Sequence, residues 1–349
     1  MPMLADRIDY VIGIDCHKNT HTAAVVDQLG GLLATVTVAT NGSGYRELWR
    51  WVCRQALGRR VWAVEGAGSY GAALTDLLIE KQEWVVEVDR PKRSKRKAGV
   101  KSDSVDALRA AKDALAADHL AEPRQRGELE AVRVLKITRK QTVQVNAEAV
   151  VQLQALLVSA PEALRARLRG LSAAQLVTAC ADLRDQPSQS TSWQATVAAL
   201  RTTARRARHA ASDVAQLDRR LSALVKAQAP KELLVELGVG TVVAAEVLSA
   251  WSHKGRLHSE AAFAKVAGTA PIEASSGQLV RHRLSRGGDR QLNSALHTVV
   301  LTRWRQDERT QRYVARRRAE GKTDREIRRC LKRYVARHLF RVLEAAPDS

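Results

Sequence analysis

The amino-terminal part of the chain alternates short apolar runs with turns, a pattern typical of β-strands. Three of these runs are separated only by hairpin-like turns, and two more alternate with helical stretches. The predicted strands are 10–14, 21–26, 32–39, 61–64 and 84–88, and the predicted helices are 44–57, 69–81 and 102–117. Hairpins followed by alternating strands and helices indicate a mixed sheet flanked by helices.

Helical periodicity dominates the middle of the chain. Residues 127–160 and 195–229 predict two long helices, joined by a polar connection. In the second helix, heptad spacing is followed by Val214, Leu217, Leu221 and Leu224. Two interpretations stay open at this point. The pair is a helical hairpin with a solvated charged face, or it is an arm that pairs subunits or grips nucleic acid.

The carboxy-terminal part is helical and rich in turns, with helices predicted at 242–248, 289–304 and 323–345. The fold class is therefore α/β plus all-α. We expect a mixed-sheet domain over 1–120, a long helical coiled-coil region over 121–230 and a helical domain over 231–349.

The net charge of the chain indicates what kind of partner it binds. Lys and Arg total 57 against 37 Asp and Glu, which gives a net charge of +20 and indicates a polyanionic partner. The chain lacks an apolar run near ~18 residues, so we expect no membrane span, and its first residues lack a signal-peptide pattern. A cytoplasmic location is expected.

Metal-binding or paired cysteines are not expected, because the four cysteines are far apart and form no CxxC pair. We interpret them as reduced thiols. His17 and His21 lie near Asp15, but catalytic zinc sites normally show a clearer ligand set. We therefore interpret both histidines as surface residues at a strand edge.

Four carboxylates form the strongest candidate site. Asp15 ends the first predicted strand and Glu65 ends the fourth, where functional groups usually emerge from an α/β sheet. Asp103 and Asp106 share one face of a helix. Carboxylates from separate elements suit Mg²⁺, which can assist phosphoryl transfer. Singly, each has a simpler role: Asp103 and Asp106 as a helix cap, and Glu65 as a strand end.

Three further features favour phosphate contact, each with a simpler alternative. The Gly238-Val239-Gly240 turn exposes backbone N–H groups before a helix, or is only a tight turn. A basic run beside the carboxylates, including Arg93, Lys95, Arg96, Lys97 and Lys101, favours phosphate binding over a solvated loop.

A serine loop is the third of these features. Ser275 and Ser276 precede Gly277 and a group of cations that could stabilise a nucleophilic serine. Most Ser-Gly loops are only loops, and Asp289 has the simpler role of capping the next helix. The cations near the serines are Arg281, Arg283, Arg286 and Arg290.

At these residues the sequence resembles the DEDD transposases of the bacterial insertion-sequence 110 family. The similar stretches are GIDCHKNTHTAAVVD (13–27), VEGAGSYG (64–71), KSDSVDALRAA (101–111), LGVGTVVAAEVL (237–248), VAGTAPIEASSGQLVRHRLSRGGDRQLNSALH (266–297) and EGKTDREIRRCLKRYVARHLF (320–340). Several motifs in the same order are far more specific than any one of them.

The resemblance implies a RuvC-like nuclease domain of ribonuclease-H-like fold, a helical coiled-coil region and a carboxy-terminal transposase domain. The family's acidic tetrad falls on Asp15, Glu65, Asp103 and Asp106, as ligands of Mg²⁺. Its nucleophilic serine falls on Ser276, with Ser275 as the alternate.

The implied function is Mg²⁺-dependent DNA recombination through a serine–DNA intermediate. The implied partners are element and target DNA, a structured guide RNA and further copies of the chain, in a bacterial cytoplasm near the nucleoid. Two alternatives remain. One is a metal-dependent junction nuclease that uses water, and the other is a non-catalytic nucleic-acid-binding protein.

Overall fold

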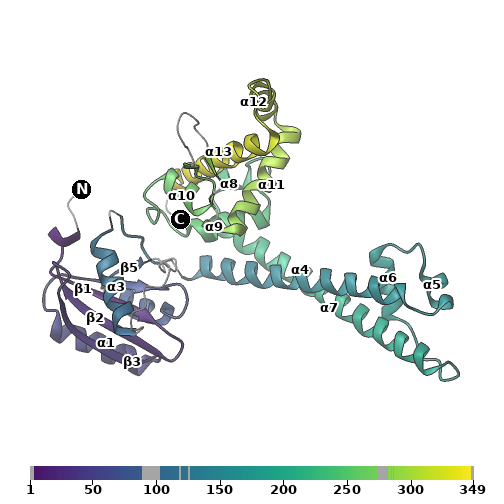
Figure 1. Cartoon of the computed structure of the whole chain (residues 1–349), viewed down its shortest axis with the longest axis horizontal. Helices are drawn as coiled ribbons and strands as arrows, with labels where there is room; N and C mark the ends of the chain where they lie inside the picture. The colour runs from purple at the N-terminus through teal and green to yellow at the C-terminus, as the bar shows by residue number, and fades with distance from the viewer. Residues whose placement is uncertain are drawn as a thin grey trace. The chain divides into compact units, whose positions relative to one another are not determined.

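The computed structural model describes residues 4–88, 103–117, 119–124, 126–273, 282–283, 285 and 287–346 (Figure 1). The chain forms two compact units. Unit 1 comprises Met1–Gln125 and Ser252–Ser259, and unit 2 comprises Arg126–Trp251 and Glu260–Ser349. Unit 1 holds the carboxylates that the sequence singles out.

A five-stranded sheet forms the centre of unit 1, in the order β3-β2-β1-β4-β5. The hairpin strands β1, β2 and β3 pair antiparallel, and β4 and β5 continue the sheet parallel to β1. The strands are β1 (Tyr10–Cys16), β2 (Thr20–Asp27), β3 (Leu32–Ala39), β4 (Arg60–Glu65) and β5 (Trp84–Val88). This confirms the mixed sheet that the hydrophobic pattern predicts.

Alternation along β1 assigns its residues to two faces of the sheet. Ile12, Ile14 and Cys16 belong to one apolar core, whereas Val11 belongs to another. Gly13 and Asp15 share the parity of Val11, so they lie on the second face. The strand is buried on both faces, which explains why its sequence is almost continuously apolar.

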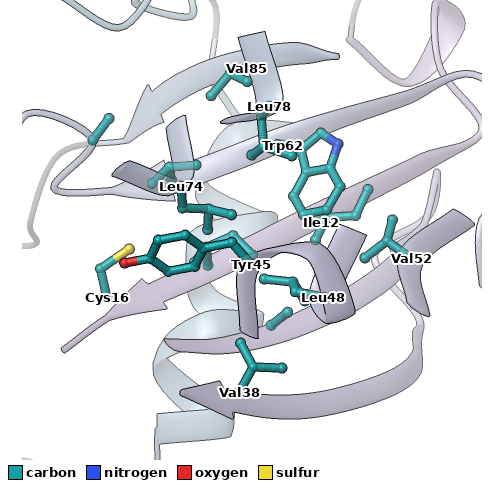
Figure 2. Close-up of a cluster of buried hydrophobic side chains, with 14 of the residues drawn as sticks. Ile12, Cys16, Val38, Tyr45, Leu48, Val52, Trp62, Leu74, Leu78 and Val85 are labelled. Atoms are coloured by element: carbon teal, nitrogen blue, oxygen red, sulfur yellow. The ribbon is translucent and has the colours of Figure 1, made fainter. Parts of the chain in front are cut away.

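The first face is covered by α1 (Gly42–Gln55) and α2 (Ala72–Glu80). Figure 2 shows this core, in which Tyr45 and Leu48 from α1 and Leu74 from α2 pack with Trp62 of β4. Asn41 begins α1 by accepting a hydrogen bond from the Gly44 backbone N–H at 2.9 Å.

Glu83, the residue before β5, links two elements at the edge of this core, α1 and β4, through its carboxylate. Its carboxylate accepts hydrogen bonds from Trp49 at 2.8 Å, Arg60 at 2.9 Å and Trp62 at 3.0 Å. Burial raises the pKa of Glu83, but the hydrogen bonds and the charge of Arg60 outweigh it and leave the pKa below its usual range. The charged carboxylate is therefore the form that the fold stabilises.

The second face is covered by α3 (Asp103–Leu115), which packs Ala110, Ala111 and Ala114 against the sheet. Small side chains on the helix allow a close approach, and Gly13 allows it on the strand. A Cβ added at Gly13 would lie 2.5 Å from the Ala111 nitrogen and 2.9 Å from the Ala111 Cβ. The absence of a side chain at Gly13 thus places the start of α3 beside the end of β1.

Unit 2 is mostly helical, and its longest helices, α4 (Glu128–Val158) and α7 (Thr191–Gln228), pack along each other. Arg139 of α4 pairs with Asp218 of α7. Lys136 of α4 also binds Glu246, at 2.7 Å. The short helices between α4 and α7 are α5 (Glu162–Leu168) and α6 (Ala173–Ala181).

The remaining elements follow α7 along the chain. They are α8 (Lys231–Leu234), α9 (Thr241–Trp251), α10 (Glu260–Val266), β6 (Ile272–Glu273), β7 (His282–Arg283), α11 (Arg290–Gln306), α12 (Glu308–Ala319) and α13 (Asp324–Ala345), and the chain opens with η1 (Leu4–Asp6). The three helices predicted in this region correspond to α9, α11 and α13.

Candidate metal centre

Asp15 and Glu65 end two neighbouring parallel strands. The register pairs Ile14 of β1 with Val64 of β4, so the next residue of each strand emerges at the same edge of the sheet. Both carboxylates are buried, at 4% and 8% exposure. Because paired residues of parallel strands point to the same face, both belong to the face that α3 covers.

The first turn of α3 supplies the other two carboxylates, Asp103 and Asp106. Both lie where the partial positive charge of a helix start favours anions. Gly13, two residues before Asp15, lets this turn approach the strand end. The close packing of β1 against α3 therefore brings together residues that are far apart in the sequence.

Two basic side chains connect the four carboxylates in pairs. The His17 Nε2 atom lies 3.0 Å from Asp15 Oδ2 and 3.5 Å from Asp103 Oδ1. A guanidinium nitrogen of Arg109 lies 2.8 Å from Asp106 Oδ1, and another lies 3.8 Å from Glu65 Oε2. These contacts place all four carboxylates around one region.

The electrostatics of Asp15 reflect this crowding. Burial raises the pKa of Asp15, His17 lowers it, and the charges of Glu65 and Asp106 raise it again, with a net result above the usual range. The thiol of Cys16, buried beside Asp15 and Glu65, has its pKa raised to about 12 and stays protonated. Clustered carboxylates repel one another, and a cation bound among them relieves that repulsion.

The donor set fits a divalent cation. One ligand atom from each of Asp15, His17 and Asp103 lies within 4.8 Å of the others. Carboxylate oxygens and an imidazole nitrogen are common ligands of divalent ions. Asp103 and His17 are partly exposed, with side-chain exposures of 53% and 41%, so the centre is open to solvent on one side.

The structure describes four of the residues that the sequence singles out in unit 2, namely Gly238, Gly240, Asp289 and Arg290. Gly238 has a φ of 88°. A Cβ there would lie 3.1 Å from the Val299 Cα, so the turn lies close against α11. A Cβ added at Gly240 would meet nothing within 4 Å among the described residues. Asp289 accepts hydrogen bonds from two backbone N–H groups of α11, which confirms its role as the cap, and exposed Arg290 begins that helix.

Comparison with protein families decides the relationship. A family model described as a transposase, of the DEDD type of IS110, matches residues 12–160. A second model, described as a transposase of the IS116/IS110/IS902 family, matches residues 233–315. Together the two models cover more than half of the chain. The chain belongs to the IS110 family of transposases. Comparison with curated proteins gave no match.

Membership in this family makes the chain a DNA-processing enzyme and supports a divalent metal site. The region matched by the DEDD-type model contains Asp15, Glu65, Asp103 and Asp106, which the structure brings together. No helix in the described part of the transposase is long and apolar enough to span a membrane.

Several predicted residues lie outside the described residues. They are Arg93, Lys95, Arg96, Lys97, Lys101, Ser275, Ser276, Arg281 and Arg286. Arg283 lies in β7, which pairs with β6, and the backbone alone is described there. The roles of all these residues stay predictions.

The structure corrects the interpretation of the two histidines. His21 is fully buried in β2 and stacks on Tyr45 with ring centroids 5.4 Å apart, so it is a core residue. Its burial lowers the pKa. His17 is partly exposed, but it contacts two of the carboxylates. Arg109 was not singled out, although its i+3 spacing from Asp106 was a usable signal.

Proposed function

We propose that this transposase recombines the end of its insertion sequence with target DNA, using a divalent metal and a serine nucleophile. One observation carries the proposal: two strand ends and one helix start converge on a single acidic cluster. The mixed sheet, covered by helices on both faces, is compatible with a RuvC-like nuclease domain.

Asp15, Glu65, Asp103 and Asp106 would hold the metal, which we propose to be Mg²⁺. When bound, Mg²⁺ supplies positive charge that polarises the scissile phosphate and stabilises the leaving oxygen. The carboxylates fix the position of that charge. The open side, where Asp103 is half exposed, is the side from which DNA would approach.

The serine supplies the nucleophile in this proposal. The hydroxyl oxygen of Ser276 attacks phosphorus, the P–O bond to one DNA strand breaks, and the hydroxyl proton passes through a base to the leaving oxygen. A phosphoserine–DNA link results. A hydroxyl of the second DNA then attacks the same phosphorus, the P–O bond to the serine breaks, and the proton of that hydroxyl passes through the base to the serine oxygen. The new phosphodiester bond joins the two DNA strands. Ser275 is the alternate nucleophile.

Nucleic-acid binding would use the basic and glycine-rich segments. The basic run from Arg93 to Lys101, the Gly238–Gly240 turn and the cations near the serine loop would contact phosphates. Binding of a guide RNA as well as DNA would account for much of the net charge of +20. Joining two DNA ends favours an oligomer. We propose the helical region 121–230, which lies between domains 1–120 and 231–349 in the sequence, as an arm that pairs subunits.

A single assay tests the chemistry. Labelled donor DNA, element RNA and Mg²⁺ are incubated with the protein, and the products are separated on a denaturing gel before and after protease treatment. Wild-type protein should form a protease-sensitive adduct that peptide mapping assigns to Ser276. Ser276→Ala should lose the adduct and recombination while nucleic-acid binding persists, and Ser275→Ala should be milder.

The carboxylates are tested in the same assay. Asp106→Asn should abolish cleavage, whereas Asp113→Asn, an exposed change on the same helix, should not. Cleavage without an adduct, unaffected by either serine change, would favour the water-dependent nuclease. Binding of DNA without any cleavage by wild-type protein would favour the non-catalytic alternative.

A further inference from the structure

His17 lies within the acidic cluster rather than beside it. It follows β1 directly, and its backbone is held by two hydrogen bonds. The His17 N–H donates to the Thr20 carbonyl at 3.0 Å, and the Thr40 hydroxyl donates to the His17 carbonyl at 3.2 Å. The turn between β1 and β2 thus fixes the position from which the imidazole reaches the cluster.

The imidazole nitrogen stands where a metal ligand would stand. Neighbouring ligands of an octahedral ion bound at about 2.1 Å are about 3.0 Å apart. The distance from His17 Nε2 to Asp15 Oδ2 is 3.0 Å, and the distance to Asp103 Oδ1 is 3.5 Å. Both separations are close to the spacing that one shared cation requires.

We propose that His17 is a ligand of the divalent cation, which gives this centre a mixed nitrogen and oxygen donor set. The inference rests on the proposed function, because it concerns the same metal. A simpler role is a hydrogen bond that orients Asp15 without touching the metal. The two roles differ in one measurable respect, since only a ligand places nitrogen in the first coordination sphere.

A nitrogen ligand also changes which ion the centre prefers. Imidazole binds first-row transition ions well, whereas Mg²⁺ prefers oxygen ligands. The wild-type centre should therefore bind Mn²⁺ more tightly than Mg²⁺. Replacing the imidazole should weaken Mn²⁺ binding more than Mg²⁺ binding.

The experiment uses the full-length protein with Mn²⁺ as the probe. Pulsed electron paramagnetic resonance detects ¹⁴N coupled to bound Mn²⁺, and titration of free Mn²⁺ gives the affinity. His17→Asn should remove the nitrogen signal and weaken Mn²⁺ binding by at least the roughly tenfold that loss of a residue that only orients a ligand costs at a metal site. The nitrogen signal, rather than the affinity, therefore separates the two roles. Competition with Mg²⁺ should show a smaller loss.

Two controls make the result decisive. His209→Asn, an exposed change on α7, should retain the nitrogen signal and the affinity. Asp15→Asn should greatly weaken Mn²⁺ binding if the proposed centre exists. His17→Gln and circular dichroism melting check that any loss arises in a folded protein.

The two proposals fail in different ways. If wild-type protein shows no ¹⁴N coupling, or if His17→Asn keeps the nitrogen signal, while Asp15→Asn loses Mn²⁺ binding, the metal centre stands and His17 is no ligand. If Asp15→Asn and wild-type protein bind Mn²⁺ equally, the metal centre of the proposed function is wrong.

Discussion

A single methyl group on the central strand should disturb the candidate metal centre from a distance. In Gly13→Ala, the new Cβ would lie 2.5 Å from the Ala111 nitrogen and 2.9 Å from the Ala111 Cβ, and closer still to the Ala107 carbonyl oxygen. Ordinary contacts of such atoms are about 3.5–4.0 Å. The helix α3 must therefore move away from β1 by roughly 1–1.5 Å to restore ordinary contacts.

Gly13→Ala should reduce both the stability of the protein and its activity. Overpacking of a core typically costs about 1–3 kcal/mol, and clashes with backbone atoms favour the upper end of that range. The same shift would move Asp103 and Asp106 relative to Asp15 and Glu65. A misplacement of about 1 Å can reduce a catalysed rate by about 100-fold.

Urea unfolding and DNA cleavage measure the two effects separately, at a temperature where the variant remains folded. Gly68→Ala is the matched control, because a Cβ there meets nothing within 4 Å among the described residues. Gly68 also lies in the loop that follows β4, near the same edge of the sheet. Wild-type stability and cleavage in Gly13→Ala would refute the claim that close packing of β1 on α3 positions the carboxylates.

Three further changes test other parts of the molecule. Glu83→Gln should destabilise unit 1 by about 2–4 kcal/mol at pH 7 in urea unfolding, because it removes the charge that Arg60 stabilises. Since the pKa of Glu83 is lowered, the stability that the ionised carboxylate contributes should be full above about pH 5 and shrink as the pH falls through the folded-state pKa. An equal difference in unfolding free energy between wild type and Glu83→Gln at pH 3 and pH 7 would contradict this. Arg109→Ala should destabilise the metal-free protein by no more than about 1 kcal/mol, because the ion pair of Arg109 with Asp106 is partly exposed. It should also tighten Mg²⁺ binding, because it removes a competing cation. Thermal melts with a chelator and with Mg²⁺ test both effects, and weaker Mg²⁺ binding would contradict the second. Replacing Lys95, Arg96 and Lys97 together by alanine should remove three phosphate contacts and flatten the slope of log affinity against log salt by about 0.7–0.9 for each contact. An unchanged slope would mean that these residues form only a solvated loop.

The succession of apolar runs and turns was enough to predict the sheet and the strand-end positions of two candidate site residues. The apolar runs mark where β1 and β4 end, so the sequence already assigns Asp15 and Glu65 to strand ends. The i+3 spacing likewise predicted that Asp103 and Asp106 share a helical face. Apolar runs and i+3 spacing involve residues that are close in the sequence, so they can be recognised without knowledge of the tertiary structure.

What the sequence did not reveal depends on turns and on distant packing. The direction of the His17 side chain depends on a turn held by Thr20 and Thr40, which the pattern of the strand does not report. The helices α5 and α6 occupy a stretch that the sequence analysis took as a connection. For α6 a local signal existed, because Ser172 and Gln175 form a capping box.

The acidic cluster places like charges close together, and the fold offsets them in pairs. His17 lies between Asp15 and Asp103, and Arg109 lies between Asp106 and Glu65. Even so, burial and neighbouring charges keep the pKa of Asp15 above its usual range, so its ionised form is a net cost to folding at neutral pH. A carboxylate held at such a cost is better explained by a bound cation than by stability. For the same reason, Asp15→Asn should leave the fold intact while it removes metal binding, which separates the two effects in one variant.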